Sequence, residues 1–335
     1  MTPSELESLF SELAVPSAGS LTARPLEFGA GRYRVARQGD GAPALLVHID
    51  EISEPPSGEQ LANLSYLPRA RLRVESAGGG IEEAVYSVLT CRSPDTELRH
   101  YFFRVLAALL DELGASPSVA AIDGALARLL ELFRALEQPG SRSVQGLWAE
   151  LLVIKLSPDP ALGVAAWHAE PEAVHDFAAG SDRLEVKGTM RTIRQHHFRL
   201  EQLAPTPEGR LLVASLMLTR TEGGLTVPEL VQHVSALLPD ATEHRARLEA
   251  VVAASLGSDW RLVSGVGFDE QAAQASLRFY ESTEVPSVDP NTPLGVSEVR
   301  FLVDLSAIPQ PKGDLRGTSQ LFHAMLPSPA GDPGV

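Results

Sequence analysis

The most informative segment of the sequence is Arg183-Leu-Glu-Val-Lys-Gly-Thr189. Leu184 and Val186 alternate with Glu185 and Lys187, a period of two that is typical of a β-strand with one face in a core. The two polar head groups then project from the same face, within about 7 Å of each other. Glu-x-Lys alone is a weak pattern, because it is also common on solvated helix surfaces. Among the lysines, only Lys187 follows a glutamate at this spacing.

A second short strand precedes this stretch, at Val174-His-Asp-Phe177. The intervening Ala179-Gly-Ser-Asp182 favours a hairpin turn, which brings Asp176 alongside Glu185. Two carboxylates and a carbonyl oxygen suit a hard divalent cation such as Mg²⁺, with Mn²⁺ as the alternative. Such a metal activates a water and polarises a phosphoryl oxygen, and a nearby lysine stabilises charge on the phosphate. We therefore predict that Asp176 and Glu185 bind the metal and that Lys187 serves the attacking water.

Another carboxylate belongs to a helix expected at residues 143–156. This helix is apolar almost all round, which is typical of a buried helix, and Glu150 lies within it. A buried carboxylate needs a partner, either a base or a metal. Glu150 is therefore expected either to complete the acidic site as a catalytic and metal-binding residue or to pair with an arginine for structural reasons.

Basic residues gather after the predicted strand. Residues 183–199 carry a local excess of four positive charges, although the whole chain has a formal net charge of −15. The acidic total argues against a protein that coats polyanions generally, whereas a local basic island fits a phosphate path. The residues predicted to contact DNA are Arg191, Arg194, His197, Arg199 and Gln202. The alternatives are surface arginines paired with nearby acids, and for His197 and Gln202 a role in orienting the lysine.

The composition indicates a mixed α/β protein with a sizeable core. The 335 residues are 44% apolar and 21% charged, so wholesale disorder is excluded. A single cysteine, Cys91, excludes an internal disulfide framework and any multi-cysteine zinc site. No apolar run approaches the ~18 residues needed to cross a bilayer, and the acidic N-terminus is unlike a secretion signal. We expect a cytoplasmic protein with no membrane partner.

The chain is expected to divide into a β-rich N-terminal domain at 1–95, a helical connector and nuclease-like domain with C-terminal strands at 96–326, and a flexible tail at 327–335. Short alternating runs broken by glycine and proline predict the β-rich part. The expected helices are 1–14, 97–113, 118–137, 143–156, 227–238 and 243–256. The expected strands of the second domain are 164–168, 174–178, 183–188, 210–218, 275–281 and 298–305.

Three motifs carry a resemblance to a known superfamily. The runs Gly146-Leu-Trp-Ala-Glu-Leu-Leu152, His175-Asp-Phe177 and Leu184-Glu-Val-Lys-Gly-Thr189 resemble the PD-(D/E)XK nucleases. More narrowly, the chain resembles the prokaryotic PD-(D/E)XK motif proteins of restriction and phage-defence systems. The resemblance covers most of the chain, and its specific motifs lie within 146–203. One departure is His175, which stands where the eponymous pattern has proline.

The resemblance implies a restriction-endonuclease-like core, a four-stranded mixed sheet flanked by helices in α-β-β-β-α-β order. It also implies Mg²⁺-dependent hydrolysis of DNA, with Asp176 and Glu185 on the metal, Lys187 beside the water, and Glu150 as the helix acid that some members add. The implied partners are DNA, a second copy of the chain, and a methyltransferase, helicase or ATPase of the same defence system. The alternatives are a non-catalytic nuclease-like subunit for DNA binding or assembly, and a metal-dependent hydrolase acting on RNA.

Overall fold

The computed structural model describes residues 1–17, 20–50, 55–76, 80–137, 143–168, 173–204, 208–238, 242–257, 263, 265–289, 293, 296–311 and 313–327. The chain divides into two units, Met1–Gln138 and Pro139–Val335. The helices at 96–137, which the sequence assigned to the second domain, therefore belong with the N-terminal strands. Of the predicted tail at 327–335, all but Pro327 lies outside the described residues.

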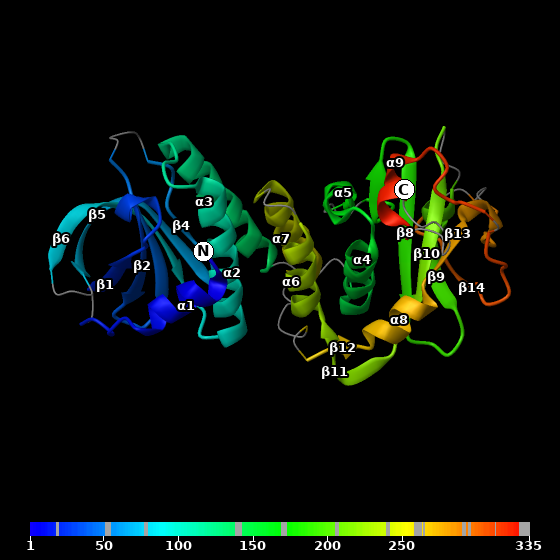
Figure 1. Ribbon diagram of the computed structural model, residues 1–335, viewed down its shortest axis with the longest axis horizontal. Helices are drawn as coiled ribbons and strands as arrows, with labels where there is room; N and C mark the ends of the chain where they lie inside the picture. The colour runs from blue at the N-terminus through cyan, green and yellow to red at the C-terminus, as the bar shows by residue number, and fades with distance from the viewer. Residues whose placement is uncertain are drawn as a thin grey trace, which may run out of the picture. The chain divides into compact units, whose positions relative to one another are not determined.

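Five strands of the N-terminal unit close into a barrel-like sheet (Figure 1). They are β1 (Leu21–Pro25), β2 (Tyr33–Gln38), β3 (Pro43–His48), β5 (Leu64–Ser76) and β6 (Ile81–Cys91). The sheet runs in the order β1-β2-β3-β6-β5, and β1 also pairs in parallel with β5, which closes it. The short β4 (Glu59–Gln60) pairs with β5, and the 3₁₀ helix η1 (Gly29–Gly31) precedes β2. The prediction of a β-rich N-terminal part is confirmed.

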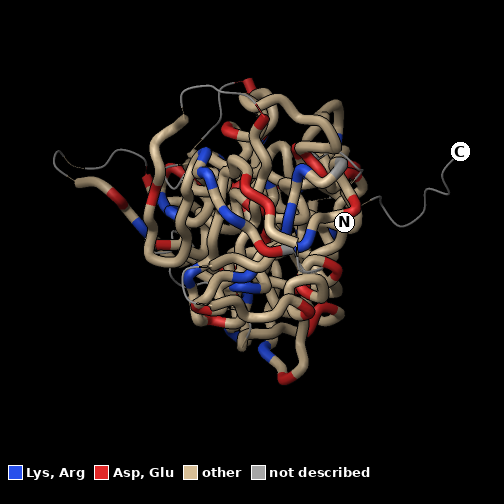
Figure 2. The backbone as a smooth tube through the Cα atoms, turned by 90° about the vertical axis from the view of Figure 1, so that its left-hand side faces the viewer, with Lys and Arg blue, Asp and Glu red and all other residues tan. Residues whose placement is uncertain are grey.

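Among its described residues this unit also contains three α-helices, α1 (Pro3–Ser11), α2 (Thr96–Leu113) and α3 (Val119–Ala135). Asp95 and Ser118 cap the N-termini of α2 and α3 with side-chain hydrogen bonds. The backbone tube in Figure 2 shows basic and acidic residues interspersed rather than gathered by sign. Pairs such as Arg34–Glu82, at 2.6 Å, account for part of this mixture.

The C-terminal unit is built on a four-stranded mixed sheet in the order β13-β10-β8-β7 (Figure 1). The strands are β7 (Phe177–Ala179), β8 (Asp182–Thr189), β10 (Leu211–Met217) and β13 (Arg278–Glu281). β8 and β10 are parallel, and the two outer pairings are antiparallel. The predicted hairpin between the segments that contain Asp176 and Glu185 is present, with β7 and β8 as its arms.

Four further strands form two separate pairs. β9 (Gln195–Arg199) pairs with β14 (Arg300–Asp304), and β11 (Arg220–Thr226) pairs with β12 (Gly267–Phe268), both antiparallel. Between the parallel strands β8 and β10, the described residues form β9 and the 3₁₀ helix η2 (Leu200–Leu203). The family resemblance implied an α-helix in this crossover.

The helices of this unit are α4 (Val144–Leu156), α5 (Pro160–Ala166), α6 (Val227–Leu237), α7 (Thr242–Leu256), α8 (Glu270–Ser276) and α9 (Gln320–Met325); a 3₁₀ helix, η4 (Ser282–Glu284), follows β13. α4 begins one residue after the predicted start, because Ser143 is its N-cap, and it ends at the predicted Leu156; most of its length is buried. The strand predicted at 164–168 is wrong. Asp159 caps α5 and Pro160 starts it, a pairing that favours helix initiation. Across the described ranges, no helix is long and apolar enough to span a membrane.

Gly188 sets how closely α4 packs on β8. A Cβ atom added at this position would lie 2.9 Å from Leu218 Cδ1 and 3.2 Å from Ala149 Cβ. Because the second contact is with a short side chain that cannot turn away, we expect Gly188→Ala to lower the free energy of unfolding by about 1–3 kcal/mol. Chemical denaturation followed by tryptophan fluorescence measures this, because all three tryptophans belong to the C-terminal unit.

Gly146→Ala, a glycine-to-alanine change on α4 itself, is the matched control. Among the described residues its added Cβ would meet Ser143 Oγ alone, at 3.3 Å, and alanine is the better helix former. This variant should be neutral or more stable. Equal stability of the Gly188→Ala variant and the wild-type protein would show that α4 can shift without cost.

Candidate active site

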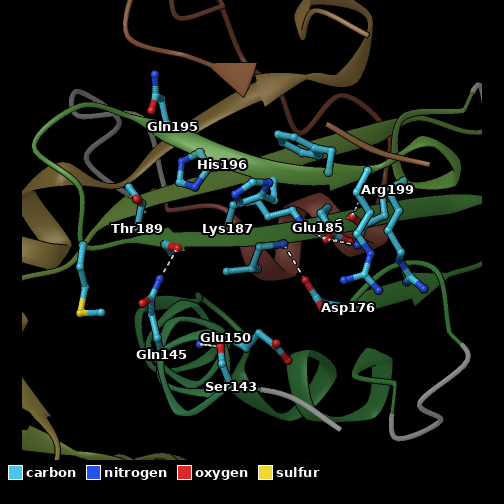
Figure 3. A pocket seen from close by; sticks show the side chains of 18 of the residues that line it. Ser143, Gln145, Glu150, Asp176, Glu185, Lys187, Thr189, Gln195, His196 and Arg199 are labelled. Carbon is cyan, nitrogen blue, oxygen red and sulfur yellow. Dashed lines mark hydrogen bonds and ion pairs between the residues drawn. The ribbon is translucent and has the colours of Figure 1, made fainter. Parts of the chain in front are cut away.

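A cavity of about 780 Å³ lies in the C-terminal unit, lined by residues of α4, β8, β9 and the segments around them (Figure 3). It brings together all four residues predicted to be catalytic and four of the five predicted to contact DNA. These residues are Glu150, Asp176, Glu185, Lys187, Arg191, His197, Arg199 and Gln202.

Strand β8 presents Glu185 and Lys187 as the period of two predicted. Leu184 and Val186 are buried, at 0% and 6% exposure. Lys187 Nζ lies 2.7 Å from Glu185 Oε1, so the two polar heads meet on one face. β8 is covered on both edges, by β7 and by β10, which fixes this strand in the middle of the sheet.

Asp176 reaches the site where β7 separates from β8. The register between these strands ends at the Phe177–Leu184 pair. One position further on, Asp176 Oδ2 accepts a hydrogen bond of 2.7 Å from the backbone N–H of Val186. The side chain thus replaces a backbone partner of the strand. This bond places the Asp176 carboxylate close enough to Glu185 for its charge to act on it.

Glu185 is a buried carboxylate with one unpaired oxygen. Its Oε1 atom accepts hydrogen bonds from Gln202 and contacts Lys187, at 2.5 and 2.7 Å. Its Oε2 atom has no hydrogen-bond partner among the described residues, and the side chain is 1% exposed. Burial, and then the negative charge of Asp176, raise the pKa of Glu185 to about 8; Lys187 offsets only part of this. A buried carboxylate with an unpaired oxygen, next to a second negative charge, lowers the stability of the folded protein unless a cation compensates the charge.

The donor set fits a hard divalent cation. Mg²⁺ is usually held by one or two carboxylates and keeps several waters, and Asp176 with Glu185 supplies two carboxylates that line one cavity. The unpaired Oε2 of Glu185 is the natural ligand atom. Within the described ranges, no three His, Cys, Asp or Glu side chains are grouped so that they could hold a metal ion.

Glu150 also lines the cavity, but a tryptophan holds it. Glu150 is 4% exposed, and its Oε2 atom accepts a hydrogen bond of 2.7 Å from the indole N–H of Trp167. The predicted cluster of three metal-binding acids is therefore not formed as the side chains stand. One partner of this buried carboxylate is therefore an indole, which the sequence did not suggest.

Gln202 joins the acid to the lysine. Its Nε2 atom donates to Glu185 Oε1 and to Val174 O, at 2.5 and 3.3 Å. Its Oε1 atom accepts from Lys187 Nζ and from the backbone N–H of Arg199, both at 3.0 Å. Every hydrogen bond that the amide can make in this orientation is used, and the residue is 7% exposed. Of its two predicted roles, this geometry supports orienting the lysine rather than contacting DNA.

Arg194 is a predicted DNA contact that does not line the cavity. It is 6% exposed, and its guanidinium donates to Ser215 O and Oγ, both at 2.8 Å, and to Ser276 O at 2.7 Å. An arginine committed to internal carbonyls braces the core and is not available to a phosphate. We therefore correct this assignment.

His196 is a neighbour of the site that the sequence did not single out. Its Nε2 atom lies 2.7 Å from Ser215 Oγ, and Ser215 is the cross-strand neighbour of Lys187. Burial, together with the positive charges of Lys187 and Arg194, lowers the pKa of His196 to about 3, so the ring is neutral at pH 7. A neutral imidazole beside the lysine adds no competing charge to the site.

The remaining basic residues that were predicted to contact DNA line the cavity. His197 is exposed on β9, and Arg191 donates to Gln195 Oε1 at 3.2 Å. Arg199 donates to the carbonyl of Ala173 at 3.3 Å, and its positive charge acts on Glu185. The sequence reasoning missed Arg300, which lines the same cavity from β14. Its only sequence signal was a basic residue in a predicted strand.

No curated protein and no solved structure matches the chain significantly. One family model does match, and it spans residues 6–306 and thus nearly the whole chain. The motifs at 146–152, 175–177 and 184–189 all fall inside this range, in agreement with the resemblance that the sequence showed. The chain therefore belongs to the family described as "Putative PD-(D/E)XK family member, (DUF4420)".

Proposed function

We propose that this protein is a Mg²⁺-dependent endonuclease that hydrolyses phosphodiester bonds in DNA, with Mn²⁺ as an alternative ion. One observation supports this above the others. A buried carboxylate oxygen of Glu185 has no described partner, and it lies beside Asp176 and Lys187 in an open cavity. Family membership, in a group related to nucleases, supports the same reaction class.

The residues divide the chemistry between them. Asp176 and Glu185 would hold the ion, which when bound activates a water and polarises the scissile phosphate. The ammonium group of Lys187 would orient the attacking water and stabilise the negative charge that grows on the phosphate oxygens. Gln202 fixes Lys187 and Glu185 relative to each other through its two amide atoms. Glu150 keeps its bond to Trp167 and adds negative potential at the cavity.

A non-catalytic subunit with the same fold is the weaker interpretation. Leaving a buried carboxylate oxygen unpaired costs about 1–3 kcal/mol or more, and a neutral side chain of the same shape would remove that cost. A protein that only binds or assembles gains nothing from such a group. An enzyme gains a metal ligand from it, which supports the catalytic assignment.

Three broader proposals accompany the reaction. The α4 helix and the four-stranded mixed sheet that carries Glu185 support a restriction-endonuclease-like core. The resemblance to restriction and phage-defence proteins supports a defence role in the cytoplasm, alongside a methyltransferase, helicase or ATPase. Cleavage of both strands needs two active sites or two visits, which supports a homodimer or a motor partner.

A plasmid assay tests the reaction. With Mg²⁺ or Mn²⁺, the purified protein should convert supercoiled DNA to nicked and linear forms, and with EDTA it should leave the plasmid intact. An Asp176→Asn variant, purified in the same way, controls for contaminating nucleases and should be inactive. Equal cleavage by this variant, or cleavage that persists in EDTA, would refute the assignment. A single-stranded RNA of matched length, run in parallel, distinguishes the RNA alternative.

A further inference from the structure

Two arginines face each other across the β9–β14 pair. Arg199 on β9 is the register partner of Arg300 on β14. Directly opposite residues of an antiparallel pair have Cβ atoms about 4.5–5.5 Å apart and share one face, and like charges at such positions are destabilising. The opposite face of this ribbon is apolar, because Phe198 and Val303 pack into a core. Because Arg199 and Arg300 lie on paired strands, the register of these strands places both side chains on the polar face of the ribbon.

Neither arginine of the pair forms an ion pair with an acid in the part of the chain that the structure describes. Arg199 donates only weakly, to the carbonyls of Ala173 and Val174 at 3.3 and 3.5 Å. Arg300 is exposed. In a chain with a formal net charge of −15, acids to pair with are plentiful, so two adjacent unneutralised arginines call for an anionic ligand.

The pair opens onto the candidate active site. Arg199 and Arg300 both line the cavity that contains Glu185 and Lys187. Arg199 is also coupled to the acid that would hold the metal, since its charge acts on Glu185. A guanidinium matches a phosphate group with a planar fork of N–H donors, and two forks can hold one phosphate from two sides.

We propose that Arg199 and Arg300 form a clamp for a second, uncleaved phosphodiester of the DNA strand whose neighbouring phosphate lies at Glu185 and Lys187. The inference rests on the proposed function, because it is the cut strand that passes the clamp. The clamp fixes the register of that strand along the cavity. Arg199 and Arg300 are binding residues, and the bond-breaking step remains with Asp176, Glu185 and Lys187.

Fluorescence anisotropy with a labelled DNA duplex in EDTA measures binding without metal-dependent cleavage. Arg300→Ala should weaken binding about tenfold and reduce the salt slope by about one, as expected for one lost phosphate contact. Arg199→Ala should behave alike, and Arg300→Lys should restore part of the loss. Arg220→Ala, which removes an exposed arginine that does not line the cavity, should bind as the wild type.

A methylphosphonate scan locates the phosphate. Replacing one phosphodiester at a time with its uncharged analogue should weaken wild-type binding at one internal position, and the Arg300→Ala variant should be insensitive at that position. If binding is weakened instead by changes at the 5′-terminal phosphate, or equally by changes at every position, the proposal is overturned.

Thermal denaturation distinguishes DNA binding by the arginines from a purely structural role. Removing one of two like charges should leave the melting temperature of the protein unchanged or raise it. A lowered melting temperature with unchanged binding would contradict the clamp.

The failure of this proposal is distinguishable from that of the proposed function. If plasmid is cleaved normally by the Arg300→Ala variant and its DNA binding is unchanged, the clamp is refuted and the nuclease stands. If the coupling to one internal phosphate is found but no metal-dependent cleavage occurs, the clamp stands and the nuclease assignment falls.

Discussion

Replacing Lys187 by alanine is expected to lower the rate of DNA cleavage by about 10²–10³-fold, the usual cost of removing one preorganised donor to transition-state charge. The ammonium group is held by Glu185 at 2.7 Å and Gln202 at 3.0 Å, and it lies 5.0 Å from the centre of the Phe198 ring. Contacts from β8, β9 and η2 therefore hold the ammonium group in place before the substrate binds. Plasmid cleavage rates at saturating Mg²⁺ measure the loss.

Lys155→Ala is the matched control for this prediction. Lys155 lies on α4 and pairs with Glu270, away from the cavity lining. The variant removes the same group from the same unit and should cleave within about twofold of the wild type. DNA binding of the Lys187→Ala variant should change far less than its rate, because the lysine acts mainly on the transition state. Matching rates for the Lys187→Ala variant and the wild type would remove the enzymatic assignment.

Glu185→Gln is expected to abolish cleavage and yet stabilise the protein. The folded-state pKa of Glu185, about 8, lies above the ordinary value of 4.5. The folded protein therefore holds this proton more tightly than the unfolded chain does. The associated stability is fully present below about pH 4.5 and is lost as the pH rises through about 8. Between about pH 5 and about pH 8, wild-type stability should fall by on the order of 3–4 kcal/mol from this group.

Urea denaturation followed by tryptophan fluorescence tests this second prediction in the C-terminal unit. The glutamine variant should lack this part of the pH dependence and be the more stable protein at about pH 8, because an amide needs no charge in the buried site. Glu201→Gln, an exposed acid of η2, serves as the control and should follow the wild type. Adding Mg²⁺ should raise the melting temperature of the wild type and not of the Glu185→Gln variant. Equal pH dependence in both proteins would mean that Glu185 is solvated.

The local parts of the site could be predicted from the sequence. Alternation along 183–189 placed Glu185 and Lys187 on one face, and the turn at Ala179-Gly-Ser-Asp182 placed Asp176 beside them. These inferences depend on backbone geometry over a few residues, which the order of residue types determines. The buried helix around Glu150 could also be predicted from the sequence, because apolar residues occupy every side of it.

The rest depended on contacts between distant segments. Nothing in the run 183–199 distinguishes Arg194, which is buried by β10 and α8, from Arg191, which reaches the cavity. The Arg199–Arg300 pair joins residues about a hundred positions apart through the register of two strands. The strand predicted at 164–168 failed for a different reason. A helix-start signal, Asp159-Pro160, was present and was outweighed by the apolar residues that follow it.

The closed barrel of the N-terminal unit limits how it can recruit another protein. Each of its five strands has a neighbour on both sides, since β1 pairs with β2 and β5. Peptide recognition by β-augmentation needs an open sheet edge with free backbone groups. Closure removes such an edge from β1, whereas the short β4 pairs with β5 alone among the described residues and keeps one. A protein that docks on the five closed strands must therefore recognise their side chains rather than add a strand to them.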